Sequence, residues 1–567
     1  MPDSFYVLLR RMRAPLIVLV LMYAVSIVGM TLIPGKDADG NVWYMSFFHA
    51  LYVVSYTAST IGFGEIPYAF SEAQRLWMVF VMHLTVIGWL YSIGSLLAVL
   101  QNAAFRKLRT EYAFENSVKR LRTPFYLVCG YGDTGSILVK ALAQEGIKAV
   151  VLDCNEDRIN ELELNDFIRS PLGLSGDAAK PAVLAMAGIS HPYCKGVIAL
   201  TDSDQTNLMV ALSARLLNPQ IRVLVRAESA EMAANVRSFG QNEVIDPFET
   251  FAERLALAIH SPGLYTLFNW LNAIPHEIIQ EPLFPRRGLW ILCGYGRFGK
   301  ALHRHLQVAG IQLQILDIDV ATAQAPAGSL EGAGTEAATL QSAGLAQAVG
   351  IIAGTNNDAN NLSILLTAQE LKPSIFTVAR QNQRDNGIIF DRANFNLLMK
   401  RGDVVAHKIF ALLRTPLIND FLQAIYAKDN DWANQLISRI VGVTNEEVPY
   451  LWEIRIGKAR VPALYKAITN QRKVTLQDLL RNPRERARPL PIIPLLLKRQ
   501  GHLLLLPQGD EVLKMSDRLL MCASYAVSRD MEWATQNDNV LHYLLTGQET
   551  SGGDLLNVWF NKWLQKP

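Results

Sequence analysis

Two long apolar runs near the N-terminus constrain the fold of this 567-residue chain more than any other feature. Ala14–Ile33 carries no charge and is about as long as a helix needs to cross a hydrocarbon core of ~30 Å. Leu76–Leu100 is a second such run, interrupted only by His83. A secretory signal peptide would need a shorter apolar core and a cleavage site of small residues, whereas Pro34-Gly35 opens a polar turn. We therefore expect two membrane-spanning helices followed by a larger water-soluble part.

Basic residues flank the two runs on their outer sides. They are Arg10, Arg11 and Arg13 before the first run, and Arg106, Lys107 and Arg109 after the second. Because cytoplasmic flanks carry the excess of Lys and Arg, both ends of the chain are predicted to be cytoplasmic. The pattern predicts a multi-pass protein of the cell inner (plasma) membrane, with the lipid bilayer as a partner and everything after residue 100 in the cytoplasm.

The segment between the runs contains a stretch, Ser46–Ser59, that is apolar and aromatic but too short to span a bilayer. It suits a re-entrant half-helix, which enters the membrane and returns on the same side. It leads directly into Thr60, Ile61, Gly62, Phe63 and Gly64. Glycine at alternate positions lets an extended backbone take dihedrals that are closed to other residues, so that successive carbonyls point one way. Rings of such carbonyls from several chains can replace the water shell of a dehydrated cation.

This segment resembles the selectivity filter of the potassium-channel family, whose signature is TVGYG followed by an acid. Here TIGFG is followed by Glu65. The resemblance implies a filter for K⁺ that is formed by four loops from four identical subunits, a homotetramer. Ile61 and Phe63 are mild changes within the signature. Glu65 stands where the family usually has aspartate, which leaves open how the filter is braced from behind.

Two glycines, Gly88 and Gly94, lie in the middle of the second apolar run. In related channels a glycine in this helix is a bending point for the inner gate, so the resemblance implies a gate hinge at one or both. Small residues in membrane helices also permit close helix packing. The sequence leaves both interpretations open.

The water-soluble part contains an internal repeat. Phe125–Leu142 (FYLVCGYGDTGSILVKAL) and Leu289–Leu306 (LWILCGYGRFGKALHRHL) each predict an apolar strand, a glycine turn and an amphipathic helix. An acid, Asp153 or Asp317, follows eighteen residues after the third glycine. This is the dinucleotide-binding fingerprint, in which a pyrophosphate lies on the helix N-terminus and the acid binds the ribose and disfavours a 2′-phosphate. We expect NAD or an adenine nucleotide rather than NADP.

Each copy continues with further strands and helices to roughly 120 residues, as a doubly wound α/β unit does. The arrangement resembles prokaryotic two-transmembrane potassium channels with tandem RCK (TrkA-N/KTN-type) regulatory domains in one chain. The predicted fold class is therefore a multidomain chain, with an all-α two-helix pore and re-entrant pore helix before two α/β Rossmann-like RCK domains with α+β C-terminal lobes. The resemblance implies crossover helices that pair these domains, and a ring of eight RCK domains in the tetramer.

The expected divisions combine the apolar runs with this resemblance. They are a cytoplasmic N-terminus (1–13), a pore domain (14–100, with outer helix 14–33, pore helix 46–59, filter 60–64 and inner helix 76–100), a linker of charged, helix-favouring sequence (101–123), a first RCK domain (124–285, with Rossmann lobe 124–246 and crossover helices 247–283) and a second RCK domain (286–567, with Rossmann lobe 288–403 and C-terminal lobe 404–567).

Two nucleotide sites follow from the repeat and the resemblance. The first is expected to use Gly130, Tyr131, Gly132, Asp133, Thr134, Gly135, Asp153, Asp177, Ala178, Thr201, Asp202 and Arg226, and the second Gly294, Gly296, Arg297, Gly299 and Asp317. The copies differ, because the second lacks an acid that matches Asp177 and has Arg297 where the first has Asp133. We expect the first to bind NAD or a similar dinucleotide. The second either binds a mono-adenosine phosphate, where arginine could recruit phosphate charge, or is structural; a structural role for both stays open.

Other partners are less well specified. Calcium regulates members of the family, and Glu228, Glu231, Asp246 and Glu249 could reach one another near the first crossover helix, although surface acids are more often solvated. Lys and Arg (54) nearly balance Asp and Glu (51), so no nucleic-acid partner is expected. The five cysteines form no CxxC pair, which argues against a disulfide framework or a zinc site.

The preferred function is a tetrameric potassium channel that is opened or closed by cytosolic ligands, and not an enzyme. A membrane-tethered NAD-dependent oxidoreductase would explain the glycine turns, but it needs a catalytic acid or base that the sequence does not supply, and it leaves the filter unexplained. A Trk-type potassium transporter shares the nucleotide-binding domains, but its pore needs several filter repeats and more spans, whereas this chain has one filter and two spans.

Overall fold

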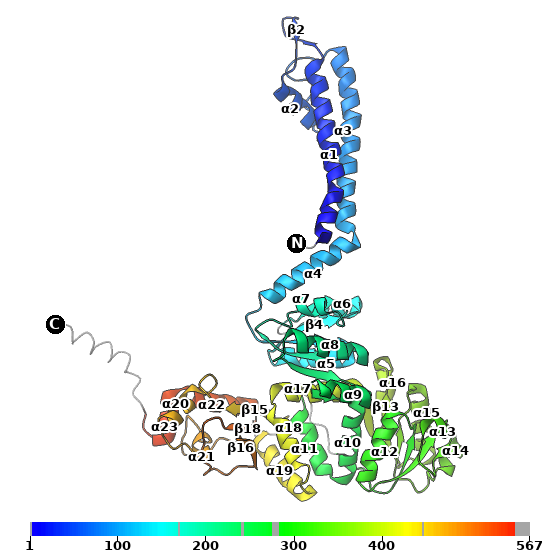
Figure 1. The fold of residues 1–567 in the computed structure, drawn as a ribbon, viewed down its shortest axis with the longest axis vertical. Helices are drawn as coiled ribbons and strands as arrows, with labels where there is room; N and C mark the ends of the chain where they lie inside the picture. The colour runs from blue at the N-terminus through cyan, green and yellow to red at the C-terminus, as the bar shows by residue number, and fades with distance from the viewer. Residues whose placement is uncertain (1–2, 168–169, 240–242, 275–282, 445–446, 550–567) are drawn as a thin grey trace, which may run out of the picture. The chain divides into compact units, whose positions relative to one another are not determined.

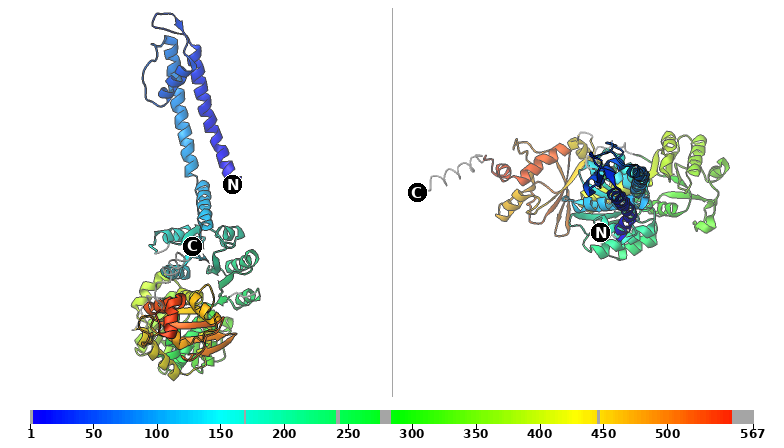
Figure 2. Two further views of the ribbon diagram at one scale, coloured as in Figure 1. Left: turned by 90° about the vertical axis from the view of Figure 1, so that its left-hand side faces the viewer. Right: turned by 90° about the horizontal axis from the view of Figure 1, so that it is seen from above.

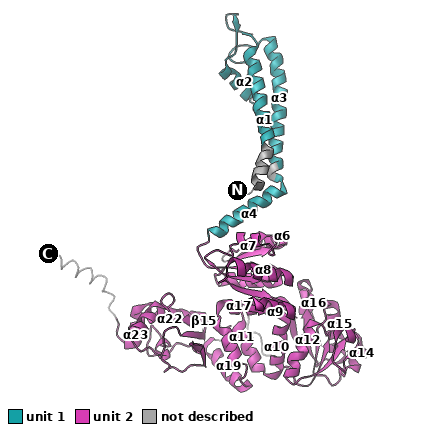
Figure 3. Cartoon of the chain, viewed as in Figure 1, with its two compact units in different colours: residues 1–120 teal, residues 121–567 magenta. Residues whose placement is uncertain are grey.

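The computed structural model describes residues 3–167, 170–239, 243–274, 283–444 and 447–549. The chain divides into two compact units, residues 1–120 and residues 121–567 (Figure 3). The first unit is mostly helical, and the second contains two parallel sheets and one antiparallel sheet.

The first unit is built on two long helices that run alongside each other (Figures 1 and 2). Its elements are α1 (Asp3–Leu32), β1 (Gly35–Lys36), β2 (Val42–Trp43), α2 (Phe47–Ala58), α3 (Glu72–Gln101) and α4 (Ala103–Lys119). Arg13–Leu32 and Glu72–Ala98 are long and apolar enough to cross a membrane. Both helices extend beyond the apolar runs at their N-terminal ends, because flanking polar residues continue the helix where apolarity stops. The apolar run therefore marks a span and underestimates the helix.

The short helix α2 begins at its cap residue Ser46, whose hydroxyl accepts a hydrogen bond of 3.4 Å from the His49 backbone. One side of α2 packs into the hydrophobic core of this unit. The buried members of that core are Ile27, Met30, Met45, Ala50, Val53, Val54, Tyr56, Phe70 and Val81. This packing fixes α2 against α1 and α3. The glycine turn at residues 60–64 follows the C-terminal end of α2.

The second unit begins with a six-stranded parallel sheet, the first lobe. Its elements are β3 (Phe125–Cys129), α5 (Asp133–Gln144), β4 (Lys148–Asp153), α6 (Glu156–Leu164), β5 (Leu172–Ser175), α7 (Pro181–Met186), β6 (Cys194–Ala199), α8 (Asp204–Leu217), β7 (Arg222–Arg226), α9 (Ala230–Ser238) and β8 (Glu243–Ile245). The strand order is β5-β4-β3-β6-β7-β8. The central strands are buried along their length, as expected for a sheet that helices cover on both faces.

A second six-stranded parallel sheet, the second lobe, repeats this plan. Its elements are β9 (Leu289–Cys293), α12 (Arg297–Val308), β10 (Gln312–Asp317), α13 (Val320–Ala323), β11 (Leu330–Glu331), α14 (Ala337–Ser342), β12 (Gly350–Ala353), α15 (Asp358–Leu371), β13 (Phe376–Gln381), η1 (Arg384–Asn386), α16 (Gly387–Arg392) and β14 (Leu397–Lys400). The order β11-β10-β9-β12-β13-β14 matches the first sheet strand for strand. The predicted fold class, a helical pore region followed by two doubly wound units, is confirmed.

Each lobe is followed by a helix that packs on the other lobe, α10 (Pro247–His260) after the first and α17 (Arg401–Arg414) after the second. Further helices follow them: α11 (Pro262–Asn272) after α10, and α18 (Leu417–Ile425) and α19 (Asn430–Thr444) after α17. Phe248 and Phe251 of α10 share a core with Phe298 of α12, whereas Ile409 and Phe410 of α17 share a core with the first lobe. The two lobes are therefore joined by an exchange of helices (Figure 1).

The chain continues into an antiparallel lobe. Its elements are β15 (Tyr450–Arg455), α20 (Pro462–Thr469), α21 (Leu476–Leu479), β16 (Ile493–Arg499), β17 (His502–Leu505), β18 (Arg518–Ala523), α22 (Tyr525–Gln536) and α23 (Asp538–Thr546), with strand order β15-β18-β16-β17. Buried residues of β15, β16 and β18 share a core with α11, α18 and α19. The antiparallel lobe is thus anchored on the exchanged helices.

Candidate functional site

The first predicted site is the turn that follows α2. Gly62 and Gly64 have φ angles of +68° and +93°, in the region that favours glycine. Backbone amides at the start of the turn donate back to the helix, Thr60 N to Thr57 O at 3.1 Å and Ile61 N to Tyr56 O at 2.9 Å. The alternating glycines of the sequence therefore coincide with two positions where the backbone requires them.

Aromatic side chains of α2 pack against this turn. The hydroxyl of Tyr56 donates a hydrogen bond to the carbonyl oxygen of Gly64. The ring of Phe63 is stacked with that of Tyr52, with 6.3 Å between centroids, and meets Tyr56 edge-on at 5.6 Å. The pore helix thus holds the end of the turn through one hydrogen bond and two ring contacts.

Glu65, the departure from the aspartate of the family signature, has its own partners. Its Oε1 accepts from Arg75 Nε at 2.8 Å, and its Oε2 accepts from Arg75 Nη2 at 3.0 Å and from the Phe70 backbone at 2.8 Å. Bidentate guanidinium–carboxylate pairs fix geometry as well as charge. Sequence reasoning missed Arg75. The signal that could have found it was a lone cation in the first turns of an otherwise apolar helix.

The two glycines of α3 lie in different surroundings. A Cβ added to Gly88 would lie 1.8 Å from Cε of Met22, so this glycine allows close packing of α3 on α1. A Cβ added to Gly94 would meet no heavy atom of the described residues within 4 Å. The packing interpretation therefore has direct geometric support at Gly88, and Gly94 is free of such contacts within one chain.

The first glycine turn of the second unit joins β3 to α5. Gly130 has φ +106°, and a Cβ on Gly135 would lie 2.0 Å from the carbonyl oxygen of Gly130, so both positions need glycine. Gly132 is the N-cap residue of α5 and has no side chain to occupy the first amides of the helix. Those amides are consequently available to an anion at the helix N-terminus.

Asp153, at the end of β4, lies directly beside this turn. It is buried, with 5% of its surface exposed, and accepts from the Tyr131 backbone at 2.6 Å and from the Asn155 backbone at 2.8 Å. Arg158 Nη1 lies 3.5 Å from the same carboxylate. A carboxylate has about four acceptor sites, so Asp153 retains capacity for a ligand hydroxyl.

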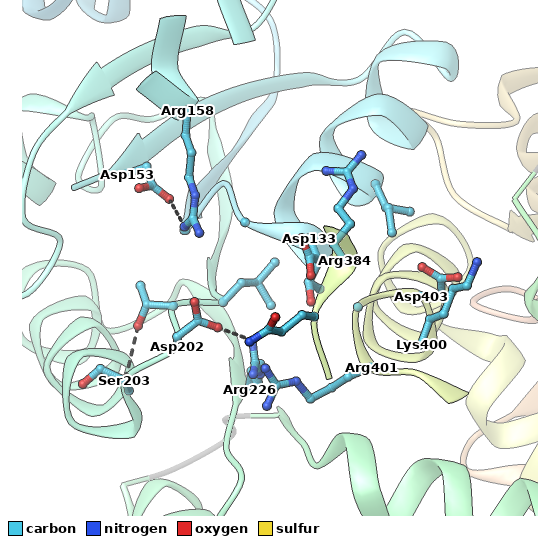
Figure 4. A pocket seen from close by; sticks show the side chains of 18 of the residues that line it. Asp133, Asp153, Arg158, Asp202, Ser203, Arg226, Arg384, Lys400, Arg401 and Asp403 are labelled. Carbon is cyan, nitrogen blue, oxygen red and sulfur yellow. Dashed lines mark hydrogen bonds and ion pairs between the residues drawn. The ribbon is translucent and has the colours of Figure 1, made fainter. Parts of the chain in front are cut away.

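A pocket of about 880 Å³ opens beside the turn (Figure 4). We call it the first pocket. Ten of the twelve residues predicted for the first site line it: Gly130, Gly132, Asp133, Thr134, Asp153, Asp177, Ala178, Thr201, Asp202 and Arg226. Tyr131 and Gly135 do not. The Tyr131 side chain is buried and its amide serves Asp153, and Gly135 packs against Gly130.

The second lobe forms the other wall of the first pocket. Its lining residues are Gln381, Asn382, Gln383, Arg384, Gly387, Ile388, Asp391, Lys400, Arg401, Gly402 and Asp403. Figure 4 shows the Arg401 side chain extending toward Arg226, and labels Arg384 and Lys400 among the lining residues of the second lobe. Sequence reasoning missed this wall and Arg158, because the wall exists only through the helix exchange. The only sequence signal was the Lys400-Arg401 pair between β14 and α17.

Glu228 connects arginines of both lobes. Its Oε1 accepts from Arg226 and, at 2.8 Å, from Arg401 Nη1, and its Oε2 accepts from Arg297 Nη2 at 3.0 Å. Burial alone would raise the pKa of Glu228, but the positive charges of Arg226 and Arg401 and the Arg226 hydrogen bond hold that pKa below its usual range. The carboxylate is therefore ionised and fully engaged at neutral pH.

The second glycine turn repeats the backbone geometry of the first. Gly294 has φ +97°, a Cβ on Gly299 would lie 2.1 Å from the Gly294 carbonyl oxygen, and Asp317 accepts from the Tyr295 backbone at 2.6 Å. Gly296 is the N-cap residue of α12, as Gly132 is of α5. Arg297 leaves this turn toward Glu228 and lies 5.6 Å from the Phe248 ring centroid.

The described residues do not assemble the four acids considered for calcium into a metal site. Asp246 caps α10 by accepting from the Phe248 and Glu249 amides at 2.8 and 3.1 Å. Glu249 pairs with Arg304 and His305, each at 2.9 Å. Glu228 is held by its three arginines, and no group of three or more His, Cys, Asp or Glu side chains in the described parts of the chain is placed to hold a metal ion.

Family models match both parts of the chain. The ion-channel family matches residues 16–102, and the TrkA-N domain family matches residues 126–247 and 290–400. The chain joins an ion-channel domain to two TrkA-N domains. The turn at residues 60–64 lies within the segment that matches the ion-channel family, and the two glycine turns lie within the segments that match the TrkA-N family.

Several known proteins are similar to this chain over part or most of its length. "Probable potassium channel protein 2" of Methanocaldococcus jannaschii is 28% identical over 272 residues, which cover 48% of this chain and 74% of that protein. "Potassium channel protein 1" of the same organism is 25% identical over 264 residues, covering 46% and 74%. A solved structure described as "GsuK Channel" is 17% identical, covers 94% of this chain and 99% of that one, and has a TM-score of 0.49.

Proposed function

We propose that this chain forms a potassium-selective channel whose opening is controlled by an adenine nucleotide in the cytosol. The observation that carries the proposal is the turn at residues 60–64, in which Gly62 and Gly64 both have left-handed φ angles, after a half-helix and between two apolar helices. Backbone carbonyls in such a turn are the ligands that K⁺ filters use. The relatives named potassium channel proteins support the same ion.

A filter of this kind needs several chains around one axis, so we propose a homotetramer. Two TrkA-N domains per chain would then supply eight domains to a cytoplasmic gating ring. The positive flanks of the apolar runs support a plasma-membrane protein with both termini in the cytoplasm. In this arrangement the ligand-binding unit and the ligand share a compartment.

The first pocket fits an adenine dinucleotide or nucleotide in three respects. The uncapped N-terminus of α5 and the glycine cradle suit a pyrophosphate, and Asp153 has acceptor capacity for ribose hydroxyls. Arg226 Nε and Gln381 Oε1, on lining residues from the two lobes, are buried without a hydrogen-bond partner among the described residues. Such atoms are costly unless something satisfies them. NAD or ADP would act here as a regulatory ligand, with no chemical step.

The second turn is proposed as a weaker or structural site. Its backbone could cradle a phosphate as the first does, but Arg297, the residue that would recruit that phosphate, is already paired with Glu228. We propose that the second lobe binds a mono-adenosine phosphate only when this pairing is broken. Calcium stays a candidate ligand for which the described residues offer no assembled site.

The energy needed for gating is modest. Taking a gate from mostly closed to mostly open requires about 5.5 kcal/mol of differential ligand binding. Shared by four identical chains, this is about 1.4 kcal/mol per subunit, or roughly tenfold in affinity between the two states. Contacts from two lobes to one ligand can supply a difference of this size, because they form only when the lobes are correctly placed.

Single-channel recording in planar bilayers tests the proposal. With potassium and sodium gradients across the membrane, the reversal potential should follow potassium, and NAD or ADP added to the cytoplasmic side should change the open probability. Asp153→Ala should abolish that response, and the matched variant Asp317→Ala in the second turn should retain most of it. Equal permeability to potassium and sodium would disprove the filter assignment. A response of Asp153→Ala equal to that of the unmodified protein would make the first pocket structural.

A further inference from the structure

Two of the four arginines that line the first pocket come from opposite lobes and share one carboxylate partner. Arg226 ends β7 of the first lobe, and Arg401 begins α17 of the second (Figure 4). Both donate to the same oxygen, Oε1, of Glu228. Glu228 is mostly buried, with 14% of its side chain exposed, and it lies outside the set of residues that line the cavity.

Glu228 is the main carboxylate partner of both arginines. Arg226 is buried, with 5% of its side chain exposed, and its other carboxylate partner, Asp202, is 3.2 Å away and largely exposed. Arg401 is about one-third exposed and lines the cavity, while it also pairs with Glu228. A carboxylate and a phosphate oxygen compete for the same guanidinium donors, since both bind arginine through charge-assisted hydrogen bonds.

We propose that Glu228 is a built-in competitor of the ligand's phosphate group. In the ligand-free protein it holds Arg226 and Arg401 back, and an anionic ligand in the first pocket must draw these donors away from it. The inference rests on the proposed function, because it assumes that the ligand of the first pocket is a nucleotide. It adds that affinity is set by an exchange of anions, with Glu228 as the counter-ion that is displaced.

The same exchange connects the two glycine turns. The second oxygen of Glu228 accepts from Arg297, which belongs to the second turn. When a phosphate takes Arg226 and Arg401, Glu228 retains only Arg297, and the Arg297–Glu228 pair becomes its sole charge-assisted contact. A ligand in the first pocket therefore strengthens the hold on Arg297 and disfavours a phosphate at the second turn.

Titration calorimetry of ADP into the purified full-length protein in detergent tests this role. Glu228→Gln removes the competing charge and should raise ADP affinity by about tenfold, which corresponds to one charge-assisted hydrogen bond freed for the ligand. Glu249→Gln is the matched control: it removes an acid that pairs with Arg304 and His305, away from the first pocket, and should leave the affinity within about twofold. Unchanged or weaker binding by Glu228→Gln would overturn the proposal, since Glu228 would then merely orient the arginines.

A double-mutant cycle keeps the test decisive if Glu228→Gln is poorly folded. Arg401→Gln should weaken ADP binding by about tenfold, and Glu228→Asp, with a shorter carboxylate, should strengthen it by a smaller factor than Glu228→Gln. In the Arg401→Gln background the gain from removing Glu228 should shrink, and full additivity would overturn the exchange. If neither ADP nor NAD binds the unmodified protein or any variant, the nucleotide proposal itself fails, which is a different result from binding that ignores Glu228.

Discussion

The carboxylate of Glu65 and the guanidinium of Arg75 are joined by two hydrogen bonds, of 2.8 Å from Nε to Oε1 and 3.0 Å from Nη2 to Oε2. The pair links the residue after the filter turn to the first turns of α3. Together with the hydrogen bond from the Tyr56 hydroxyl to the Gly64 carbonyl, it holds the C-terminal end of the turn from two directions. The acid that departs from the family signature therefore has a specific partner in this chain.

Removing this pair should make the filter less stable without changing its selectivity. Arg75→Gln leaves Glu65 with the Phe70 amide alone, and we expect bursts of openings to shorten by about two- to fivefold, the scale of a partly exposed ion pair. Arg75→Lys keeps the charge but loses the bidentate geometry, so its burst length should lie between those of Arg75→Gln and the unmodified protein. Single-channel recording in symmetrical potassium measures the burst length. Glu72→Gln, another charge change in the same helix turn, is the control, and an equal effect there would mean that surface charge alone matters.

The two glycine turns allow a paired test of which lobe binds the ligand. An added Cβ would lie 2.0 Å from a carbonyl oxygen in Gly135→Ala and 2.1 Å from one in Gly299→Ala. Each variant should lower the free energy of unfolding by about 1–3 kcal/mol, as overpacking does. Calorimetry with ADP should show binding lost in Gly135→Ala and retained in Gly299→Ala. The reverse pattern would move the principal site to the second lobe.

The sequence predicted those parts of the molecule whose geometry is local. The glycine turns, their helices and the acids Asp153 and Asp317 lie within thirty residues of one another in each copy, and backbone sterics fix their relation. Arg401 lies far along the chain from Asp153 and reaches the first pocket only because α17 packs on the first lobe. No spacing rule predicts such a contact, because it depends on which apolar helix face packs on which lobe. Glu65 and Arg75 are close in sequence, but a loop of irregular backbone separates them, so periodicity gave no signal.

Close contact between the exchanged helix α17 and the first glycine turn should couple lobe packing to ligand affinity. A Cβ on Gly402 would lie 3.0 Å from Cβ of Asp133 and 3.2 Å from the amide of Thr134, at the start of α5. Gly402→Val should push α17 away from this turn, weaken ADP binding by about tenfold and lower the unfolding free energy by about 1–3 kcal/mol.

The matched control for this variant is Gly442→Ala in α19, where an added Cβ meets no heavy atom of the described residues within 4 Å. Replacing glycine inside a helix by alanine should stabilise the protein by up to about 1 kcal/mol and leave ADP binding unchanged. Calorimetry and thermal unfolding in detergent measure both quantities. Unaltered ADP affinity in a folded Gly402→Val protein would show that the second-lobe wall does not act on the ligand.

The charge network around Glu228 should give the ligand-binding unit an acid-dependent stability with a definite sign. The pKa of this carboxyl is lower in the folded protein than the unfolded value of about 4.3, because Arg226 and Arg401 favour its ionised form more than burial opposes it. Its contribution is thus complete above the unfolded pKa and is lost as pH falls through the folded pKa.

Glu228→Gln leaves three arginines without their shared counter-ion, so the ligand-free variant should be less stable than the unmodified protein by about 3 kcal/mol at pH 7. That difference should shrink as the pH falls below the unfolded pKa of about 4.3 and through the lower folded pKa, where the unmodified carboxyl also becomes neutral. Thermal unfolding of the full-length protein from pH 7 to pH 3 measures it, with Glu249→Gln as the control for general acid sensitivity. Because a phosphate can replace the lost carboxylate, ADP at pH 7 should stabilise Glu228→Gln more than the unmodified protein. An equal shift in both proteins would mean that the ligand does not reach these arginines.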